Sequence, residues 1–179
     1  MGRILLMALL LFALNTNAQE INWVTLEEAV ELQQKEPRKI MMDFYTNWCG
    51  PCKLLDKRTF SNKDVTRYVN ENYYAVKFNA EGNSKVKFND LEFTNPKYDP
   101  AKANRRNYSH QLTTYFGVSA FPTIVFLDEN KWLITQVKGF QTPQQLEVYL
   151  KLFHSNDYKN LKNQEEANAY FKNFKPQFN

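Results

Sequence analysis

The chain lacks cysteines outside one short motif. Only two of its 179 residues are cysteines, Cys49 and Cys52, and they are separated by Gly50 and Pro51. No thiols remain for a framework of structural disulfides, so the pair is either redox-active or half of a metal site. The Gly-Pro spacer favours the redox interpretation. Proline at the second spacer position presets φ for a first helical turn, where both sulfurs can approach each other.

Histidine is also scarce, which bears on the metal alternative. His110 and His154 are 44 positions apart and lie on different predicted helices. A zinc finger needs two closely spaced histidines. A c-type haem needs a histidine directly after the second cysteine, where this chain has Lys53. The sequence therefore predicts no metal and no cofactor, and both histidines are expected to be ordinary surface or packing residues.

The chain begins with an apolar run that is too short to span a membrane. Residues 4–14 form this run of about eleven residues, which follows Arg3 and precedes the small-residue sequence Thr-Asn-Ala at 16–18. The pattern predicts a signal peptide over 1–18, cleaved after Ala18, with an uncleaved membrane anchor as the alternative. No cysteine lies near the cleavage site for lipid attachment. We therefore expect an exported protein of the periplasm or cell envelope, with no stable membrane anchor after cleavage.

The chain has no long run of basic residues and no internal repeat. Its net charge is +4, and Arg3 is the only charged residue among 1–18, so the rest of the chain carries +3. This mild excess predicts no nucleic-acid partner. The 179 residues less the 18 of the signal peptide leave 161, which suits one domain with a real core. We assign residues 19–155 to this domain, with an insertion at about 80–107, and 156–179 to a C-terminal helical extension.

Hydrophobic periodicity and capping residues predict an α/β fold. We expect strands at 23–24, 40–45, 73–78, 123–127 and 132–138, a small hairpin at 86–93, and helices at 25–36, 53–57, from about 62, 108–116, 142–153 and 160–174. The β-α-β-α-β order of the first half implies parallel strands with crossover helices. The turn at 128–130 implies an antiparallel hairpin, so the expected sheet is mixed and covered by helices.

Three motifs together resemble the thioredoxin family. They are WCGPCK at 48–53, MDFY at 42–45 and, about seventy residues after the second cysteine, FPT at 121–123. The resemblance extends over roughly 23–153. It implies a thioredoxin fold, with a central mixed β-sheet flanked by helices. The insertion between the third strand and the next helix makes that stretch longer than is usual in the family.

A second likeness follows the cysteine motif. The sequence TFSN at 59–62, with Val65 after it, resembles the thioredoxin-like domains of envelope disulfide reductases, such as the C-terminal domain of DsbD-type thiol:disulfide interchange proteins. Two features depart from ordinary thioredoxins. The proline that kinks their active-site helix, near Asp56, is absent, and Tyr45 stands where the family usually has tryptophan. These departures leave the choice of substrate open.

The cysteines have different expected roles. Cys49 is the expected nucleophile, because a helix N-terminus favours the thiolate. It attacks a substrate disulfide to give a mixed disulfide, and Cys52, expected to be more buried, then attacks Cys49 and releases the reduced substrate. The alternative is a structural disulfide, but so short a loop constrains the unfolded chain little.

Two charged residues complete the expected catalytic set. Asp43 lies in a strand expected to be buried, which raises the pKa of its carboxyl. The resemblance implies that Asp43 accepts the proton of Cys52 during release and that Lys77 is its partner. The alternatives are a strand-end carboxylate bonded to the backbone and a solvated strand lysine.

The resemblance also implies a substrate-binding surface. Pro122 is expected to be cis and to face the cysteine motif, and the backbone of Phe121 pairs with an extended substrate segment. Trp48 flanks the nucleophile, and the spacer residues Gly50 and Pro51 complete the surface. The alternatives are a simple turn at Pro122 and a core role for Trp48.

The function that these residues favour is that of an exported thiol–disulfide oxidoreductase acting as a reductant. Cys-Gly-Pro-Cys resembles reducing members of the family, whereas oxidants and isomerases tend to have histidine in the spacer. The expected partners are oxidised protein substrates or a redox relay, with a membrane thiol-reducing protein as electron donor. Two alternatives stay open: a disulfide oxidase or isomerase, and a binding or chaperone module that uses residues 80–107 and the C-terminal tail.

Overall fold

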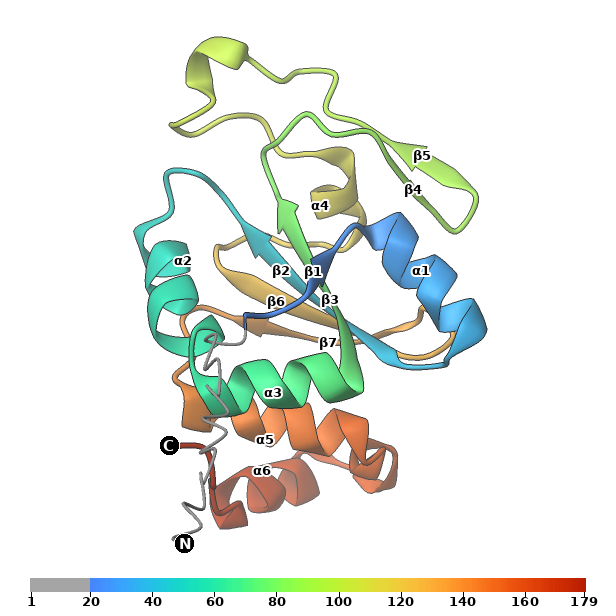
Figure 1. Cartoon of the computed structure of the whole chain (residues 1–179), viewed down its shortest axis with the longest axis vertical. Coiled ribbons are helices and arrows are strands. Elements are labelled where there is room, and N and C mark those ends of the chain that lie inside the picture. The colour runs from blue at the N-terminus through green and yellow to red at the C-terminus, as the bar shows by residue number, and fades with distance from the viewer. Residues whose placement is uncertain (1–19) are drawn as a thin grey trace, which may run out of the picture.

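The computed structural model describes residues 20–179 (Figure 1). The predicted signal peptide and its cleavage site lie outside these residues. Within residues 20–179, none of the helices combines the length and the apolar character needed to cross a membrane.

A five-stranded mixed sheet forms the centre of the fold, as the sequence predicts. Its strand order is β1-β3-β2-β6-β7, in which β1, β3 and β2 are parallel and β6 and β7 are antiparallel to their neighbours. A separate two-stranded hairpin, β4-β5, confirms the small hairpin expected around Asn89 and Asp90. The strands are β1 (Trp23–Val24), β2 (Lys39–Tyr45), β3 (Tyr73–Asn79), β4 (Val86–Phe88), β5 (Leu91–Phe93), β6 (Thr123–Leu127) and β7 (Leu133–Lys138).

Residues 20–179 form six α-helices. They are α1 (Leu26–Lys35), α2 (Gly50–Leu55), α3 (Lys63–Asn72), α4 (Gln111–Tyr115), α5 (Pro143–His154) and α6 (Gln164–Asn173). Capping residues explain several starts: Thr25 and Thr142 form the capping boxes of α1 and α5, and Asn62 caps α3. A π-helical turn, Asp56–Phe60, continues α2 without a break.

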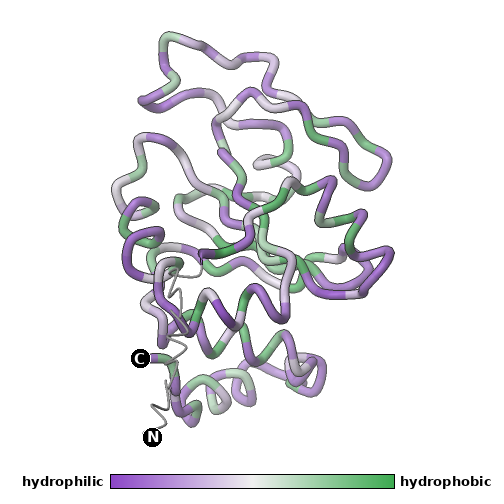
Figure 2. Tube along the Cα trace, viewed as in Figure 1, coloured by the Kyte–Doolittle hydropathy of each residue, from purple (hydrophilic) through white to green (hydrophobic). Residues whose placement is uncertain are grey.

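Two hydrophobic clusters pack on the two faces of the sheet. One joins the sheet to α2, α3 and α5, and the other joins it to α1, α4 and the β4-β5 hairpin. Residues of β2 alternate between the clusters, because successive side chains of a strand point to opposite faces. Met41 belongs to the first cluster, whereas Met42 and Phe44 belong to the second. Figure 2 shows the hydrophobic positions concentrated along the strands and the inner sides of the helices.

The segment between β3 and α4 forms a lobe at one end of the molecule, at the top of Figure 1. Hydrogen bonds within the lobe hold separate parts of its chain together. Asn95 Nδ2 donates to the carbonyl oxygens of Gly82 and Tyr108, at 2.9 and 2.8 Å. The backbone N–H of His110 donates to the carbonyl of Ala80 at 2.9 Å, so the two ends of the segment meet. This lobe contains the insertion expected at 80–107.

Two predicted helices are too long at their N-termini. The expected helix 108–116 begins only at Gln111, because Asn107 and Tyr108 are held in the lobe and the His110 ring caps the helix by accepting the Leu112 N–H at 3.0 Å. The expected helix 160–174 begins at Gln164, because Asn160 belongs to a 3₁₀ turn and the Asn163 side chain caps the helix by accepting the Glu166 N–H. Gly117 ends α4 with φ +67°, as expected for a glycine C-cap.

The C-terminal segment packs against α5. Phe178 is buried in the first hydrophobic cluster, and the backbone N–H groups of Gln177 and Phe178 donate to Glu147 Oε2 at 2.7 and 2.8 Å. Glu147 is fully buried and pairs with Lys151 at 2.6 Å. The tail therefore satisfies a buried carboxylate, which ties this segment to the rest of the fold.

Candidate functional site: a cysteine pair at a helix N-terminus

The two cysteines form a disulfide at the start of α2. Their Cα atoms are 5.3 Å apart. Cys49 is the N-cap residue, and its sulfur accepts the backbone N–H of Cys52 at 3.1 Å. An N-terminal turn presents unpaired N–H groups and the positive end of the helix dipole. The Cys49 sulfur therefore lies where its thiolate is stabilised after reduction.

The expected difference in burial between the cysteines is wrong for this disulfide form. The exposed fractions are 3% for Cys49 and 2% for Cys52. The S–S bond joins the two sulfurs at the first turn of α2, and both cysteines are buried there. The exposed part of the motif is the spacer, Gly50 and Pro51. No heavy atom lies within 4 Å of the position of a Cβ on Gly50, so an incoming chain meets an open surface there.

Asp43 is buried in β2, as predicted. It is 1% exposed and lies on the same face of the sheet as Met41, the face covered by α2. Within residues 20–179 its Oδ1 has no hydrogen-bond donor. Burial raises the pKa of the Asp43 carboxyl to about 7; the Lys77 charge lowers it, and the Asp56 charge raises it further. A carboxyl that titrates near neutral pH can both accept and return a proton.

Lys77 is the register partner of Asp43 on β3, but it pairs more closely with another acid. Lys77 Nζ is 3.9 Å from Asp43 Oδ2, whereas it forms a direct ion pair with Asp56 Oδ1. Its ammonium also lies over three aromatic rings, 5.2 Å from the centroid of Trp23, 5.3 Å from Tyr45 and 5.9 Å from Phe60. Asp43 is therefore only partly neutralised.

Asp56 is a site residue that sequence reasoning missed. It begins the π-helical turn, at the place where ordinary thioredoxins were expected to have their kinking proline. Turns of this kind are rare and frequently occur at functional sites. The sequence signal was the replacement of that proline by a charged residue near the cysteines. The contact with Lys77, 21 positions away, was not visible in any local pattern.

The Phe121–Pro122 peptide bond is cis, as predicted. Pro122 is buried and precedes β6, which is hydrogen-bonded to β2. The ring of Phe121 meets the ring of Trp48 edge to face, with centroids 6.4 Å apart. Trp48, Phe121 and the cysteine motif are thus neighbours on one surface, although about seventy residues separate them in the chain.

Trp48 is also tied to the lobe, which the sequence did not reveal. Its indole Nε1 donates to Glu81 Oε2 at 2.7 Å, and the same oxygen accepts the backbone N–H of Asn107 at 2.8 Å. The guanidinium of Arg106 lies over the Trp48 ring, 5.2 Å from its centroid. Glu81 and Arg106 therefore join the candidate site from a segment to which no role could be assigned by sequence.

The histidines lie outside this arrangement. The fully buried His110 caps α4 and places Nε2 2.7 Å from the carbonyl of Ser84; burial lowers the pKa of its ring, and the Ser84 hydrogen bond opposes this shift. His154 is an exposed residue at the end of α5. Residues 20–179 contain no group of three or more histidine, cysteine or acidic side chains arranged to hold a metal ion.

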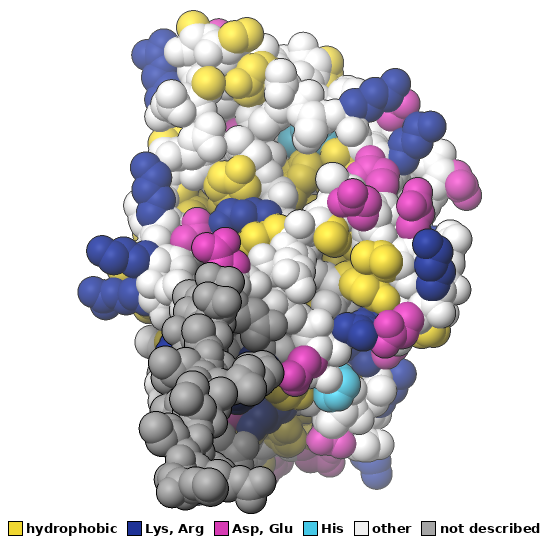
Figure 3. Space-filling model, viewed as in Figure 1, with side chains coloured by type: hydrophobic (Ala, Val, Ile, Leu, Met, Phe, Trp, Pro, Cys, Tyr) yellow, Lys and Arg dark blue, Asp and Glu magenta, His cyan; other side chains and the backbone are white. Residues whose placement is uncertain are grey.

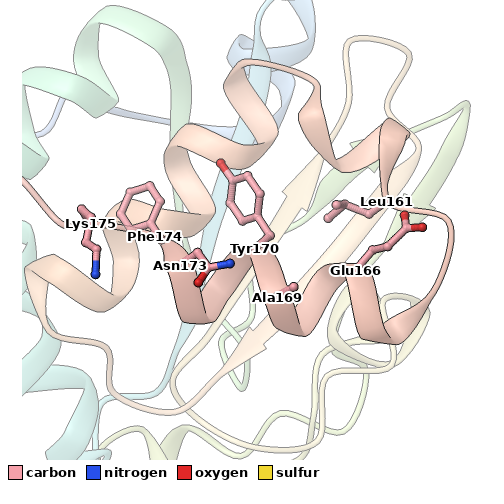
Figure 4. Close-up of a pocket in the computed structure, with 7 residues that line it drawn as sticks. All are labelled: Leu161, Glu166, Ala169, Tyr170, Asn173, Phe174 and Lys175. Carbon is pink, nitrogen blue, oxygen red and sulfur yellow. The ribbon is translucent and has the colours of Figure 1, made fainter.

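A cavity lies along α6, away from the cysteines (Figure 4). Its volume is about 640 Å³, and Tyr170 and Phe174, with ring centroids 6.3 Å apart, form much of its apolar wall. None of its lining residues comes from β2, α2 or the loop of Pro122. It contributes nothing to the chemistry of the cysteine pair.

Comparisons with known proteins agree with this geometry. A family model described as a thioredoxin-like domain matches residues 26–154. The thiol:disulfide interchange protein DsbD of Haemophilus ducreyi is 29% identical over 126 residues, which cover 67% of this chain and 18% of that protein. The thiol-disulfide oxidoreductase ResA of Bacillus thuringiensis is 25% identical over 127 residues, covering 68% of this chain and 67% of that protein.

A solved structure supports the fold. The thioredoxin-fold protein of Helicobacter pylori superposes with a TM-score of 0.57 at 20% identity, over 76% of this chain and 83% of that one. The predicted thioredoxin fold is thereby confirmed. The chain spans less than a fifth of the DsbD relative, so that protein's whole activity does not transfer to this one.

Proposed function

The chain belongs to the thioredoxin-like family of thiol–disulfide oxidoreductases, and we propose that it works outside the cytoplasm as a reductant of protein disulfides. One observation carries the proposal: Cys49 and Cys52, the only cysteines of the sequence, form a disulfide at the first turn of α2, and α2 covers the face of the sheet on which Asp43 is buried. The Gly-Pro spacer supports the reducing direction, and the predicted signal peptide over 1–18 supports export.

The first step forms a mixed disulfide. In the reduced protein the Cys49 thiolate, stabilised at the helix N-terminus, attacks one sulfur of a substrate disulfide. The substrate S–S bond breaks, and the second substrate sulfur leaves as a thiolate. Phe121, beside the cis Pro122, offers its backbone to an extended substrate segment, while Trp48, Gly50 and Pro51 form the adjoining surface.

The second step releases the substrate. The Cys52 thiol gives its proton to the Asp43 carboxylate, and the Cys52 thiolate attacks Cys49 Sγ. The mixed disulfide breaks, the first substrate sulfur leaves as a thiolate, and two electrons have passed to the substrate. Lys77 limits how far burial raises the pKa of Asp43. The Cys49–Cys52 disulfide of the structure is the oxidised end of this cycle.

The cycle needs a source of electrons. In an exported protein the donor is a thiol pair of another protein, because thiol–disulfide exchange transfers the two electrons directly. We propose a membrane thiol-reducing protein as this donor and oxidised exported proteins as substrates. No metal or cofactor takes part in the proposed steps.

Trapping tests the assignment of the nucleophile. In Cys52→Ser the second step is blocked, so mixed disulfides through Cys49 accumulate with oxidised exported proteins of the host. The matched control, Cys49→Ser, retains Cys52 and traps none. Equal trapping by both variants, or none by either, would contradict the proposal. Full retention of cellular function by Cys49→Ser would instead favour a binding module on this fold.

A further inference from the structure

The lobe builds one wall of a groove beside the cysteine motif. The groove has a volume of about 410 Å³ and lies between the lobe and the loop that precedes Pro122. Trp48 and Phe121 line it on the motif side, and Glu81, Arg106 and Asn107 line it on the lobe side. A substrate segment laid along the backbone of Phe121 therefore passes next to residues of the lobe.

The charges in the groove differ in their exposure. Glu81 is 7% exposed, and its Oε2 is occupied by the Trp48 indole and the Asn107 N–H. Arg106 is exposed, lies over the Trp48 ring, and forms no ion pair with a carboxylate of residues 20–179. Its charge is therefore the one that an incoming side chain meets.

One part of the lobe, the loop that carries Arg106, is basic. Residues 95–108 contain four basic residues and one acid, for a net charge of +3, which equals the net charge of the whole of 19–179. In Figure 3, one patch of Lys and Arg side chains lies at the upper left edge, where Figure 1 places the loop after β5, and others lie at the upper right and along the left edge. Lys97 and Lys102 both lie near the ring of Tyr108, at 5.9 and 5.7 Å. Oriented charge of this kind selects partners of opposite sign.

The wall is fixed by contacts within the described residues. Asn107 Oδ1 accepts the backbone N–H of Asp99 at 3.0 Å, and Asn107 Nδ2 donates to the Asp99 carbonyl at 2.8 Å. On the motif side, Asn47 Nδ2 donates to the Ala103 carbonyl at 2.8 Å. These bonds connect the loop that carries Arg106 directly to the segment before the cysteines, so Arg106 has a defined place relative to them.

We propose that Arg106 is a specificity-determining residue, and that the groove takes extended substrate segments with an aspartate or glutamate close to the reactive cysteine. This inference rests on the proposed function, because it names the substrate class of the same site. The guanidinium lies over the indole, 5.2 Å from its centroid, and a guanidinium can meet a carboxylate with two N–H groups.

The rates at which the protein reduces charged and neutral peptides test the inference. The probes are disulfide-linked dimers of Ala-X-Cys-X-Ala, where X is glutamate, glutamine or lysine, and the reduced protein is mixed with each in stopped flow. Rates with dithiothreitol correct for the intrinsic reactivity of each peptide. We expect wild type to prefer the glutamate peptide over the lysine peptide by about fivefold at low salt, the size of effect that a partly exposed ion pair gives. The preference should shrink as salt is added.

Variants in the lobe locate the effect. Arg106→Ala should remove most of the preference and Arg106→Glu should reverse it. Arg106→Lys should keep only part of it, because the charge remains but the paired N–H groups of the guanidinium are lost. Arg105→Ala is the matched control, because it removes an adjacent charge outside the groove lining and should keep most of the preference. The rates of each variant with the glutamate and lysine peptides are divided by its rate with the glutamine peptide, which removes any effect of the substitution that does not depend on substrate charge.

The outcomes separate two failures. If all three peptides are reduced through Cys49 but the ratio is the same in wild type and Arg106→Ala, the inference on Arg106 is wrong and the redox function stands. If Arg105→Ala lowers the ratio as much as Arg106→Ala, general surface charge replaces the groove as the cause, and the inference is again wrong. If reduced wild type reduces none of the peptides, the proposed function fails and the inference fails with it.

Discussion

Asp43 and Phe44 are adjacent on β2, and both are buried, but they face opposite sides of the sheet. Phe44 packs edge to face on its register partner Phe78, with ring centroids 5.3 Å apart, and on Phe116, at 5.8 Å. Asp43 has Lys77 as its register partner, at 3.9 Å, and one oxygen without a donor in residues 20–179. Phe44 thus stabilises the fold, whereas Asp43 is retained at a cost in stability.

The cause of that cost is desolvation. Burial of an apolar ring stabilises the folded protein. Burial of a carboxylate removes its hydration, and only hydrogen bonds or a close opposite charge compensate for this loss. Lys77 gives Asp43 less of this compensation because it pairs directly with Asp56. The comparison shows that adjacent buried residues of one strand can contribute to stability with opposite sign.

The largest expected effect on stability comes from substitution of Phe44. Phe44→Ala should lower the free energy of unfolding by about 4 kcal/mol, because it removes a fully buried ring and leaves a cavity. Phe44→Leu is the control and should cost less, since it keeps most of the volume. Urea unfolding of the oxidised proteins measures both. A loss below about 1 kcal/mol for Phe44→Ala would contradict the stabilising role of Phe44.

The neighbouring substitution should act in the opposite direction. The pKa of Asp43 is about 7 in the folded protein and near its ordinary value of 3.8 in the unfolded chain, so between these values the folded state binds the extra proton. Wild-type stability should therefore fall as pH rises from about 4 to about 7. Asp43→Asn removes this dependence and should be more stable above pH 7, by up to about 4 kcal/mol.

The same substitution should slow the chemistry. Without the carboxylate, Cys52 loses its proton acceptor, and release of the mixed disulfide should slow by about a hundredfold, at the lower end of what general bases contribute. Quenched-flow decay of a mixed disulfide made with the glutamine peptide measures this step. A stabilised Asp43→Asn protein with an unchanged release rate would show that Asp43 is buried without being used.

A smaller effect distinguishes the two partners of the Lys77 ammonium. Lys77→Met should raise the pKa of Asp43 further, because the Lys77 charge lowers it, whereas Asp56→Asn should lower that pKa by removing a like charge and freeing Lys77 to approach. Carboxyl NMR titration of the oxidised proteins measures the two shifts. Shifts of the same sign would contradict the proposed competition between Asp43 and Asp56.

Local patterns predicted most of the fold. Strand β2, the capping boxes at Thr25 and Thr142, and the cysteine motif each depend on residues within a few positions of one another, so periodicity and spacing were enough. The predicted start of α4 was wrong because contacts within the lobe hold Asn107 and Tyr108 outside the helix. A cap can be predicted from a residue's neighbours in the chain. Tertiary contacts that keep a residue out of a helix cannot be predicted in this way.

The candidate site was predicted in part for the same reason. Cys49, Cys52 and Asp43 belong to motifs that a sequence shows directly. Asp56 and Glu81 act through partners 21 and 33 positions away, Lys77 and Trp48, and no spacing rule connects them. The expected difference in burial between the cysteines was wrong, because burial depends on what packs over each residue in the fold.

The reduction potential of the Cys49–Cys52 pair tests the central claim most directly. Equilibration of the purified protein with glutathione buffers, followed by counting of free thiols, gives the value. The account predicts a potential near or below about −230 mV, which places the protein with reductants and relays. A value between about −180 and −120 mV would place it with isomerases or oxidants and would contradict the reducing direction.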